Sequence, residues 1–193
     1  MRLENKNAII TGATGGIGFA TVSKYLDEGA NVMMVGRSED KLVEVHNQLG
    51  KPNNAAFCVA ESTDEIAIKD SVQKTSDTFG SVDIVIANAG TEGVVQPLVD
   101  YSVEDFNHTL IVNVTGVWLY LKYAIPHMEN QGYGSIVAVA SGAGVVGFPG
   151  LCPYSASKHA VCGMVKTACL EYGEKGIRFN ALAPGPIDNR MME

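Results

Sequence analysis

The stretch NAIITGATGGIG, residues 7–18, decides the fold of this 193-residue chain. Its first five residues form an apolar run that predicts a buried β-strand, and a helical pattern begins at residue 16. The glycines in between allow a tight turn and let the backbone approach a phosphate closely. The free N–H groups at the start of the helix also favour an anion. The stretch therefore predicts a nucleotide-binding turn, and the competing interpretation is a purely structural tight turn.

Short apolar runs alternate with longer helical patterns along the rest of the chain. We predict strands at residues 7–11, 31–35, 55–60, 82–87, 135–139 and 178–183. We predict helices at residues 16–28, 39–49 with Ser38 as cap, 65–78 behind a capping box at 62–65, 102–128 with or without a break, and 154–172. Regular alternation of apolar strands and helices predicts the α/β class: a doubly wound, mostly parallel, Rossmann-like sheet with helices on both faces.

Length and composition restrict the class of protein. A chain of 193 residues predicts one domain, spanning 1–193, with a single dinucleotide-binding catalytic core. The net charge of −7 argues against a nucleic-acid or anionic-membrane surface. No apolar segment is a credible membrane span and the start carries no secretory signal, so we expect a cytoplasmic protein. The sequence stops soon after a Pro184-Gly185-Pro186 turn, and we expect a C-terminal piece to be missing.

The cysteines and histidines show no spacing typical of a metal site, so no metal is predicted. We expect the four cysteines to be buried thiols in a reducing compartment. They are Cys58, Cys152, Cys162 and Cys169.

The end of the second predicted strand bears on the choice of dinucleotide. An NAD site usually has Asp or Glu there, which accepts hydrogen bonds from the ribose hydroxyls. This chain has Gly36-Arg37-Ser38, and the Arg37 guanidinium can bind a 2′-phosphate instead. We therefore favour NADP over NAD. The competing interpretation is that Arg37 is solvated and other groups hold the ribose.

Tyr154 and Lys158 lie one helical turn apart and so share a helix face. A positive charge beside a phenol favours the phenolate, which makes Tyr154 a candidate general acid/base. Ser141 precedes the tyrosine by thirteen positions, and Asn113 lies further upstream. Each of the four residues alone could have a purely structural role, such as capping a helix, packing or facing solvent. All four in this order, behind a dinucleotide turn, indicate a catalytic site.

Together these residues resemble the short-chain dehydrogenase/reductase family, in its compact single-domain branch. The turn at 11–18 resembles the cofactor motif of the family, 87–90 its N-A-G motif, and Pro184-Gly185 the turn after its sixth strand. Asn113, Ser141, Tyr154 and Lys158 resemble its catalytic tetrad. The glycine spacing fits both G-x-x-x-G-x-G and G-x-x-G-x-x-G, and the N-A-G motif with the tetrad favours the first.

The resemblance implies roles for the tetrad. Tyr154 would protonate the carbonyl oxygen in reduction, and Lys158 would lower the Tyr154 pKa and hold the nicotinamide ribose. Ser141 would bind the substrate oxygen, and Asn113 would distort its helix and position a water that links Lys158 to solvent. The resemblance also implies a set of cofactor-binding residues: Gly12, Thr14, Gly16, Ile17, Gly18, Arg37, Ser38, Glu61, Ser62, Asn88, Ala89, Gly90, Tyr154, Lys158, Pro184, Gly185 and Ile187.

Two positions depart from the family pattern. Glu61 stands where an aspartate commonly contacts the adenine, and Asn189 stands where a threonine usually lies near the nicotinamide carboxamide. Both replacements keep a group that can make the hydrogen bond.

The predicted function is NAD(P)-dependent interconversion of a ketone or 3-oxoacyl group and a secondary alcohol, with NADP favoured. The alternatives are a non-catalytic NADP(H)-binding sensor and a sugar-nucleotide epimerase or dehydratase. The predicted substrate wall, residues 93–98 and 142–153, is apolar apart from Gln96 and holds no arginine. We therefore expect a hydrophobic or neutral carbonyl substrate. The resemblance implies a homodimer or homotetramer built on helices around 113–128 and 154–172.

Overall fold

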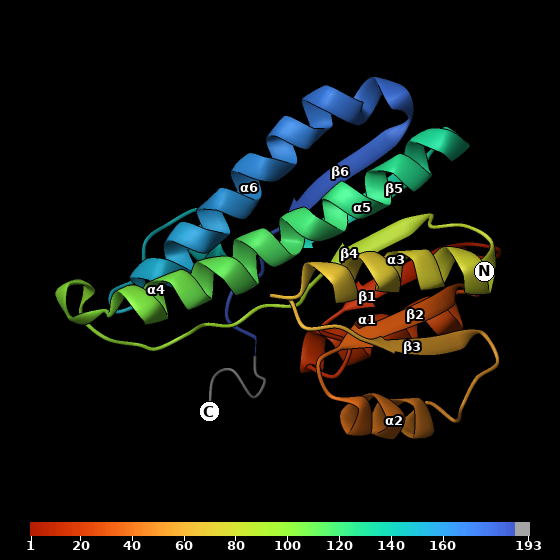
Figure 1. Ribbon diagram of the computed structural model, residues 1–193, viewed down its shortest axis with the longest axis horizontal. Coiled ribbons are helices and arrows are strands. Elements are labelled where there is room, and N and C mark those ends of the chain that lie inside the picture. The colour runs from red at the N-terminus through yellow and green to blue at the C-terminus, as the bar shows by residue number, and fades with distance from the viewer. Residues whose placement is uncertain (188–193) are drawn as a thin grey trace.

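The computed structural model describes residues 1–187 and contains one six-stranded sheet in the order β3-β2-β1-β4-β5-β6 (Figure 1). Every neighbouring pair of strands is parallel. The strands are β1 (Asn7–Thr11), β2 (Asn31–Gly36), β3 (Ala55–Val59), β4 (Ile84–Ala87), β5 (Gly134–Val139) and β6 (Ile177–Leu182). The α-helices are α1 (Gly16–Asp27), α2 (Glu39–Gln48), α3 (Glu65–Phe79), α4 (Val103–Leu110), α5 (Gly116–Gln131) and α6 (Cys152–Tyr172).

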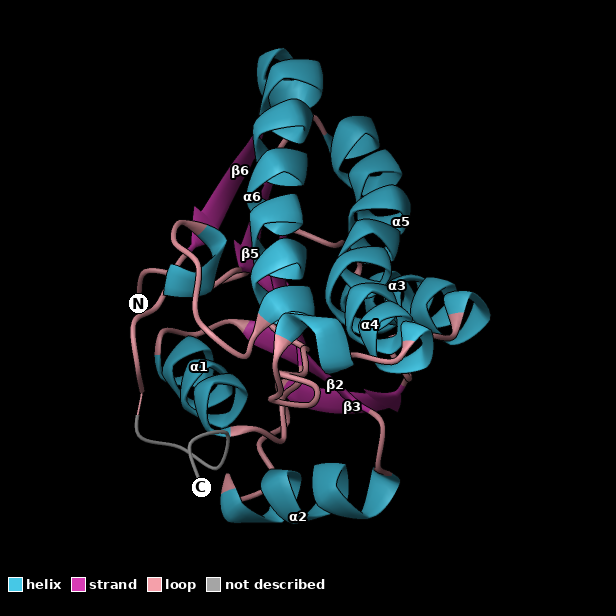
Figure 2. Ribbon diagram, turned by 90° about the vertical axis from the view of Figure 1, so that its left-hand side faces the viewer, coloured by secondary structure: helices cyan, strands magenta, loops and turns pink. Residues whose placement is uncertain are grey.

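Two apolar layers enclose the sheet. Helices α1 and α2 cover one face, and α3, α5 and α6 cover the other (Figure 2). Side chains alternate along β1, so Ile9 joins the cluster under α3, α5 and α6 while Ala8 and Ile10 join the cluster under α1 and α2. The strands are apolar on both faces because both faces are covered.

The strand order reverses between β1 and β4. The chain moves outward from β1 through β2 to β3, then returns to β4 on the other side of β1 and moves outward to β6. Open α/β sheets bind ligands at such a switch point, outside the carboxyl ends of the strands. The predicted fold class is confirmed, and most predicted bounds agree with the structure to within two residues.

The predicted capping box at residues 62–65 is wrong. Asp64 is the N-cap of α3, and its carboxylate accepts a hydrogen bond of 3.0 Å from the Ala67 N–H. Glu65 does not fold back onto its own helix, because its carboxylate accepts hydrogen bonds from Lys122 and Tyr123 on α5. The helix is therefore capped locally by Asp64, while Glu65 binds partners that are distant in sequence.

The long helical region predicted at 102–128 is interrupted. Residues Ile111–Thr115 form a π-helical segment between α4 and α5, so the break that the sequence left open is present. None of the described helices is long and apolar enough to cross a membrane. The expectation of four buried thiols is wrong, because Cys169 is exposed and the other three are half-buried.

The amino ends of the central strands are held by Asp83, which is buried immediately before β4. Its carboxylate accepts hydrogen bonds from the Asn7 N–H at 2.8 Å and from the hydroxyls of Ser81 and Tyr133, each at 2.9 Å. These bonds join β1, β4 and the start of β5 at the edge opposite to the carboxyl ends.

Replacing Asp83 with Ala should lower the free energy of unfolding by about 3 kcal/mol, since the Asn7 N–H, the two hydroxyls and the Gln131 side-chain amide lose a charged acceptor. Urea unfolding followed by circular dichroism measures the change. Asp77→Ala, at an exposed carboxylate on α3, is the matched control and should stay within about 0.5 kcal/mol. Equal losses in the two variants would contradict the role given to Asp83.

Candidate active site

A cavity of about 990 Å³ lies at the carboxyl ends of the strands, across the switch point between β1 and β4. We call it the main cavity. All but two of the predicted site residues that lie within 1–187 line it, and the exceptions are Ser38 and Asn113. Asn189 lies outside the described residues. One continuous cavity therefore brings together residues from both halves of the chain.

The glycine turn forms one wall of the main cavity and leaves no room for side chains. Gly12 has a φ of +62°, and a Cβ there would lie 2.9 Å from the Asn88 side-chain amide. A Cβ on Gly18 would lie 2.1 Å from the Gly12 carbonyl oxygen. Within residues 1–187, no side chain caps the N-terminus of α1 at Gly15. The turn thus presents bare backbone and a helix N-terminus, which suits a dinucleotide phosphate.

The segment after β4 is bonded directly to this turn. The Thr11 hydroxyl accepts hydrogen bonds from the N–H groups of Asn88 at 2.9 Å and Ala89 at 2.8 Å. The Asn88 side chain donates in return to the Thr11 carbonyl at 2.9 Å. These bonds fix the spacing between β1 and β4 at the point where the cavity opens.

Arg37 follows β2 and lines the main cavity. It is exposed, and it makes no hydrogen bond or ion pair with any residue in the described part of the chain. Ser38 does not line the cavity, and its hydroxyl caps α2 by accepting from the Lys41 N–H at 3.4 Å. The guanidinium of Arg37 is therefore available for a ligand.

The residues after β3 and the segment 184–187 form two further parts of the cavity wall. Glu61 and Ser62 follow β3, and the Glu61 carboxylate accepts a hydrogen bond of 3.1 Å from the Ser62 N–H. On the opposite side, the Gly142 N–H donates to the Pro184 carbonyl at 2.8 Å. That bond holds the 184–187 segment against the end of β5, and Pro184, Gly185 and Ile187 all line the cavity.

Lys158 is buried, with only 4% of its surface exposed. Its ammonium donates a hydrogen bond of 2.9 Å to the Val139 carbonyl at the end of β5. Burial removes the ammonium from water and lowers the pKa of Lys158 to about 8, an effect that nearby Cys162 partly opposes. Lys158 therefore carries a charge that is easily lost in a mildly basic solution.

Tyr154 lies in the first turn of the same helix, one turn before Lys158. Its ring centroid lies 5.6 Å from the Lys158 ammonium nitrogen, and its side chain is half-buried at the cavity wall. Ser141 lines the cavity at the end of β5, and its hydroxyl accepts a hydrogen bond of 3.2 Å from the Ala143 N–H. The cavity thus contains a phenol, a hydroxyl and a buried ammonium from neighbouring elements.

Asn113 is fully buried in the π-helical segment, behind the cavity wall. Its side chain accepts from the Thr91 N–H and donates to the Thr91 carbonyl, both at 2.8 Å. It also donates at 3.0 Å to the Ser157 hydroxyl, which itself donates to the Tyr154 carbonyl at 2.6 Å. The predicted distortion of the helix is present, but the side-chain amide is occupied by protein groups.

Gly90 lies between Asn113 and Lys158. A Cβ on this glycine would lie 3.1 Å from the Asn113 side-chain oxygen and 3.4 Å from the Lys158 nitrogen. The chain after β4 can pass this close to both groups because it has no side chain there.

The substrate wall was predicted only in part. Phe148 and Leu151 line the main cavity, but the other large apolar side chains of the predicted wall do not. These are Val94, Val95, Leu98, Val145 and Val146, which are 44–68% exposed. The lining residues that sequence reasoning missed include Glu92, His108, Val112 and Tyr120. Glu92 could have been found, since it follows the fourth strand at the ligand-binding edge.

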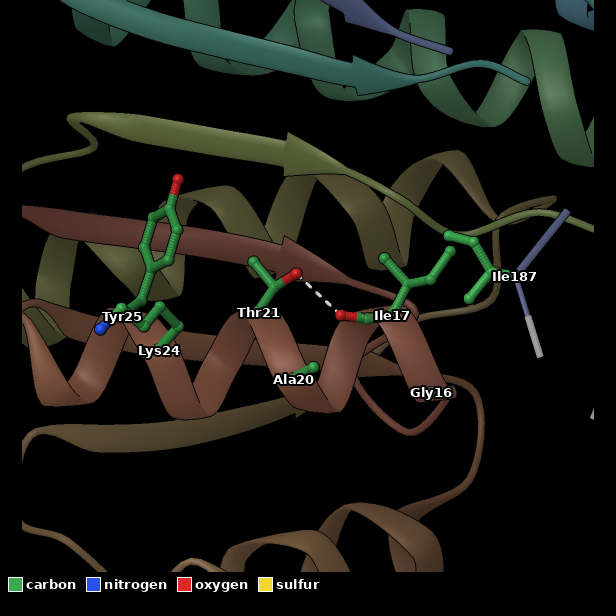
Figure 3. A pocket seen from close by; sticks show the side chains of 7 residues that line it. All are labelled: Gly16, Ile17, Ala20, Thr21, Lys24, Tyr25 and Ile187. Atoms are coloured by element: carbon green, nitrogen blue, oxygen red, sulfur yellow. Dashed lines mark hydrogen bonds between the residues drawn. The ribbon is translucent and has the colours of Figure 1, made fainter. Parts of the chain in front are cut away.

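A second hollow of about 540 Å³ lies along the outer surface of α1. Figure 3 shows Ile17, Ala20, Thr21 and Tyr25 on the helix, with Ile187 at one end. The Thr21 hydroxyl donates to the Ile17 carbonyl at 2.7 Å, so it is already paired within the helix. Among the described residues, Lys24 and Tyr25 are the titratable side chains that line this hollow, whereas the main cavity is lined by Arg37, Glu61, Glu92, His108, Tyr120, Tyr154 and Lys158.

Comparisons with known proteins agree with this arrangement. The sequence profile of short chain dehydrogenases matches residues 6–193. The 3-oxoacyl-acyl-carrier-protein reductase of Thermotoga maritima is 39% identical over 195 residues, which cover 100% of this chain and 78% of the relative.

Two solved structures resemble the fold closely. Levodione reductase superposes with a TM-score of 0.95 at 33% identity, covering 98% of this chain and 75% of that one. Xylitol dehydrogenase bound to NAD⁺ superposes with a TM-score of 0.92 at 34% identity, covering 96% and 72% of the two chains.

The lowered pKa of Lys158 predicts a pH-dependent stability. Between its folded value of about 8 and the ordinary value of 10.5, the unfolded chain binds more protons than the folded chain. Stability should therefore rise with pH in this window. From about pH 7.5 to about pH 9.5 the unmodified protein should gain about 2 kcal/mol relative to Lys158→Met.

Urea unfolding of both proteins at the two pH values measures this difference. Lys166→Met, at an exposed lysine on the same helix, is the control and should follow the unmodified protein. Parallel pH profiles for Lys158→Met and the unmodified protein would mean that the buried ammonium is not destabilised.

Proposed function

The chain belongs to the short-chain dehydrogenase family of oxidoreductases, and we propose that it interconverts a ketone or 3-oxoacyl group and a secondary alcohol. The observation that carries the proposal is that Tyr154 and buried Lys158 line the same cavity as the bare glycine turn. A site for an anionic dinucleotide is thus continuous with a site for proton transfer. The three relatives act on chemically different substrates by name, so the family alone does not select one.

The bare turn at Gly12–Gly18 and the uncapped start of α1 fit the phosphates of a nicotinamide dinucleotide. Lys158 and the backbone of 88–90 would hold its nicotinamide half, and Glu61 and Ser62 its adenine half. Pro184, Gly185 and Ile187 would close over it. When bound, the cofactor supplies or accepts the hydride at the substrate carbon.

The residues of the chain supply the proton and the orientation. Tyr154 donates its phenolic proton to the carbonyl oxygen in reduction and takes a proton from the alcohol in oxidation. The Lys158 ammonium stabilises the phenolate that reduction leaves behind. Ser141 binds the substrate oxygen through its hydroxyl. Asn113 positions the others through Thr91 and Ser157, since its own amide is fully engaged.

We propose NADP as the preferred cofactor, because Arg37 is the charged group at the end of β2 and has no protein partner within residues 1–187. No Asp or Glu replaces it at residues 36–38 to accept from ribose hydroxyls. Because the related xylitol dehydrogenase is bound to NAD⁺, the two cofactors have to be compared directly.

We also propose that residues 1–193 are one catalytic domain that forms a homodimer or homotetramer. The exposed side chains of Trp118 on α5 and Leu170 on α6 support an interface on these helices.

Tyr154→Phe should reduce turnover by a factor of about 10² to 10⁴, because the general acid is lost, while cofactor binding is kept. Activity is measured with NADPH on a ketose, a cyclic diketone and a 3-oxoacyl thioester. Tyr172→Phe makes the same change at the other end of α6 and should leave turnover intact. An active Tyr154→Phe variant would refute the mechanism, and binding without turnover by the unmodified protein would favour a sensor.

Arg37→Ala should weaken NADPH binding by a factor of about 10 to 100, because a charge-assisted hydrogen bond to the 2′-phosphate is lost. NADH binding should stay the same. Fluorescence titration with both nucleotides measures the two affinities. Arg178→Ala, at an exposed guanidinium near the amino end of β6, is the control. Tighter binding of NADH by the unmodified protein would overturn the assignment of NADP.

A further inference from the structure

Glu92 is the one acidic side chain at the tetrad end of the main cavity, among the residues that the structure describes. The other carboxylate in the lining is Glu61, at the end of β3, which already accepts from the Ser62 N–H. Glu92 is half-buried and makes no side-chain hydrogen bond or ion pair within residues 1–187. A carboxylate without a protein partner in a cavity is available to a ligand.

The position of Glu92 follows from its neighbours. Gly90, two residues earlier, lies directly against the Lys158 ammonium, and two residues of chain span about 7 Å at most. The backbone of Glu92 is therefore close in space to the tetrad, whereas Arg37 follows β2 on the other half of the sheet. Phe148, Leu151 and Val112 are the large apolar residues of the same lining.

The backbone around Glu92 is held on both sides. Thr91 is bonded through its N–H and its carbonyl to the buried amide of Asn113. Gly93 has a φ of +75° and donates its N–H to the Thr91 hydroxyl at 3.1 Å. A Cβ on Gly93 would lie 2.4 Å from the Thr109 hydroxyl oxygen, so this residue packs tightly on α4. The loop thus presents Glu92 from a fixed backbone, as a selective site requires.

Within residues 1–187, no free lysine or arginine side chain at this end of the cavity balances the carboxylate. The Lys158 ammonium is already bonded to the Val139 carbonyl, and Arg37 follows β2 at the nucleotide end. The remaining polar side chain of the lining near α4 is the imidazole of His108. Among the described residues, a substrate at this end therefore meets large apolar side chains and the single carboxylate of Glu92.

We propose that Glu92 determines specificity: it accepts a hydrogen bond from a hydroxyl next to the reacting carbonyl and repels substrates that carry a carboxylate there. This inference rests on the proposed oxidoreductase function. It selects hydroxyketones, and the matching vicinal diols in the oxidative direction, as the substrate class. A lone carboxylate favours a donor and disfavours a second anion for the same electrostatic reason.

Three ketones that differ only at C1 test the proposal: 2-octanone, 1-hydroxy-2-octanone and 2-oxooctanoate. Their kcat/KM values are measured from NADPH oxidation with the unmodified protein, Glu92→Gln and Glu92→Leu. The unmodified protein should prefer the hydroxyketone to 2-octanone by about tenfold and 2-octanone to the oxoacid by a similar factor. Glu104→Gln, which removes an exposed charge from α4 outside the cavity, is the control and should keep these ratios.

The two substitutions separate charge from hydrogen bonding. Glu92→Gln should raise the kcat/KM for the oxoacid about tenfold relative to that for 2-octanone, because the charge repulsion is lost while a hydrogen-bond acceptor remains. Glu92→Leu should also abolish the advantage of the hydroxyketone. If both variants keep the two kcat/KM ratios within about twofold of those of the unmodified protein, the enzyme is active but Glu92 does not determine its specificity. If the unmodified protein binds NADPH and reduces a ketose, a cyclic diketone or a 3-oxoacyl thioester but none of this series, the hydroxyketone assignment is contradicted. If it reduces none of these compounds, the proposed function itself is contradicted.

Discussion

The buried amide of Asn113 is the interaction on which the site depends. It bonds both backbone groups of Thr91, as a neighbouring strand would, and it reaches the Ser157 hydroxyl on α6. One side chain thereby joins the loop after β4 to the helix that carries Tyr154 and Lys158. Because the amide is fully buried, losing any of its partners would leave a polar group without compensation. The geometry of the site is therefore coupled to the stability of the core.

The π-helical segment is part of the same constraint. Residues Ile111–Thr115 wind more loosely than the α-helices on either side. Such a segment costs regular hydrogen bonding and persists where tertiary contacts hold it. Here the contacts are the bonds of Asn113, whose amide is turned toward Thr91 and away from its own helix. A regular helix in this place would direct the Asn113 amide elsewhere. The π-helical distortion and the hydrogen bonds of Asn113 to Thr91 and Ser157 therefore depend on each other.

Most of the fold could be predicted from the sequence because its signals are local. Apolar runs gave the strands of the sheet, and the glycines at 12 and 18 indicated a close approach that the structure contains. The tetrad residues could be identified from their resemblance to a family motif, and three of them line the main cavity. Their chemical roles remain predictions, because distances between protein atoms do not measure proton transfer.

The parts that could not be predicted depend on partners distant in sequence. Glu65 looks like half of a capping box, but Lys122 and Tyr123 on α5 compete for its carboxylate. The valines of the predicted substrate wall are apolar in the sequence but exposed in the structure. They do not line the cavity, although Phe148 and Leu151 from one of the same loops do. The place of Glu92 after the fourth strand was a usable signal, but the bonds between Thr91 and Asn113 that hold its backbone could not be predicted.

The burial of the Lys158 ammonium lowers the stability of the fold. Its ammonium is buried with one carbonyl acceptor, and its lowered pKa means that burial opposes the charged form. A methionine or leucine would fill the same space without that penalty, so packing alone does not account for a lysine here. A charge kept next to Tyr154 at the expense of stability is the pattern expected when chemistry selects the residue. Glu92 differs from Lys158 in that its carboxylate is half-buried and has no hydrogen-bond or ion-pair partner within residues 1–187, which leaves it free for the ligand contact proposed above.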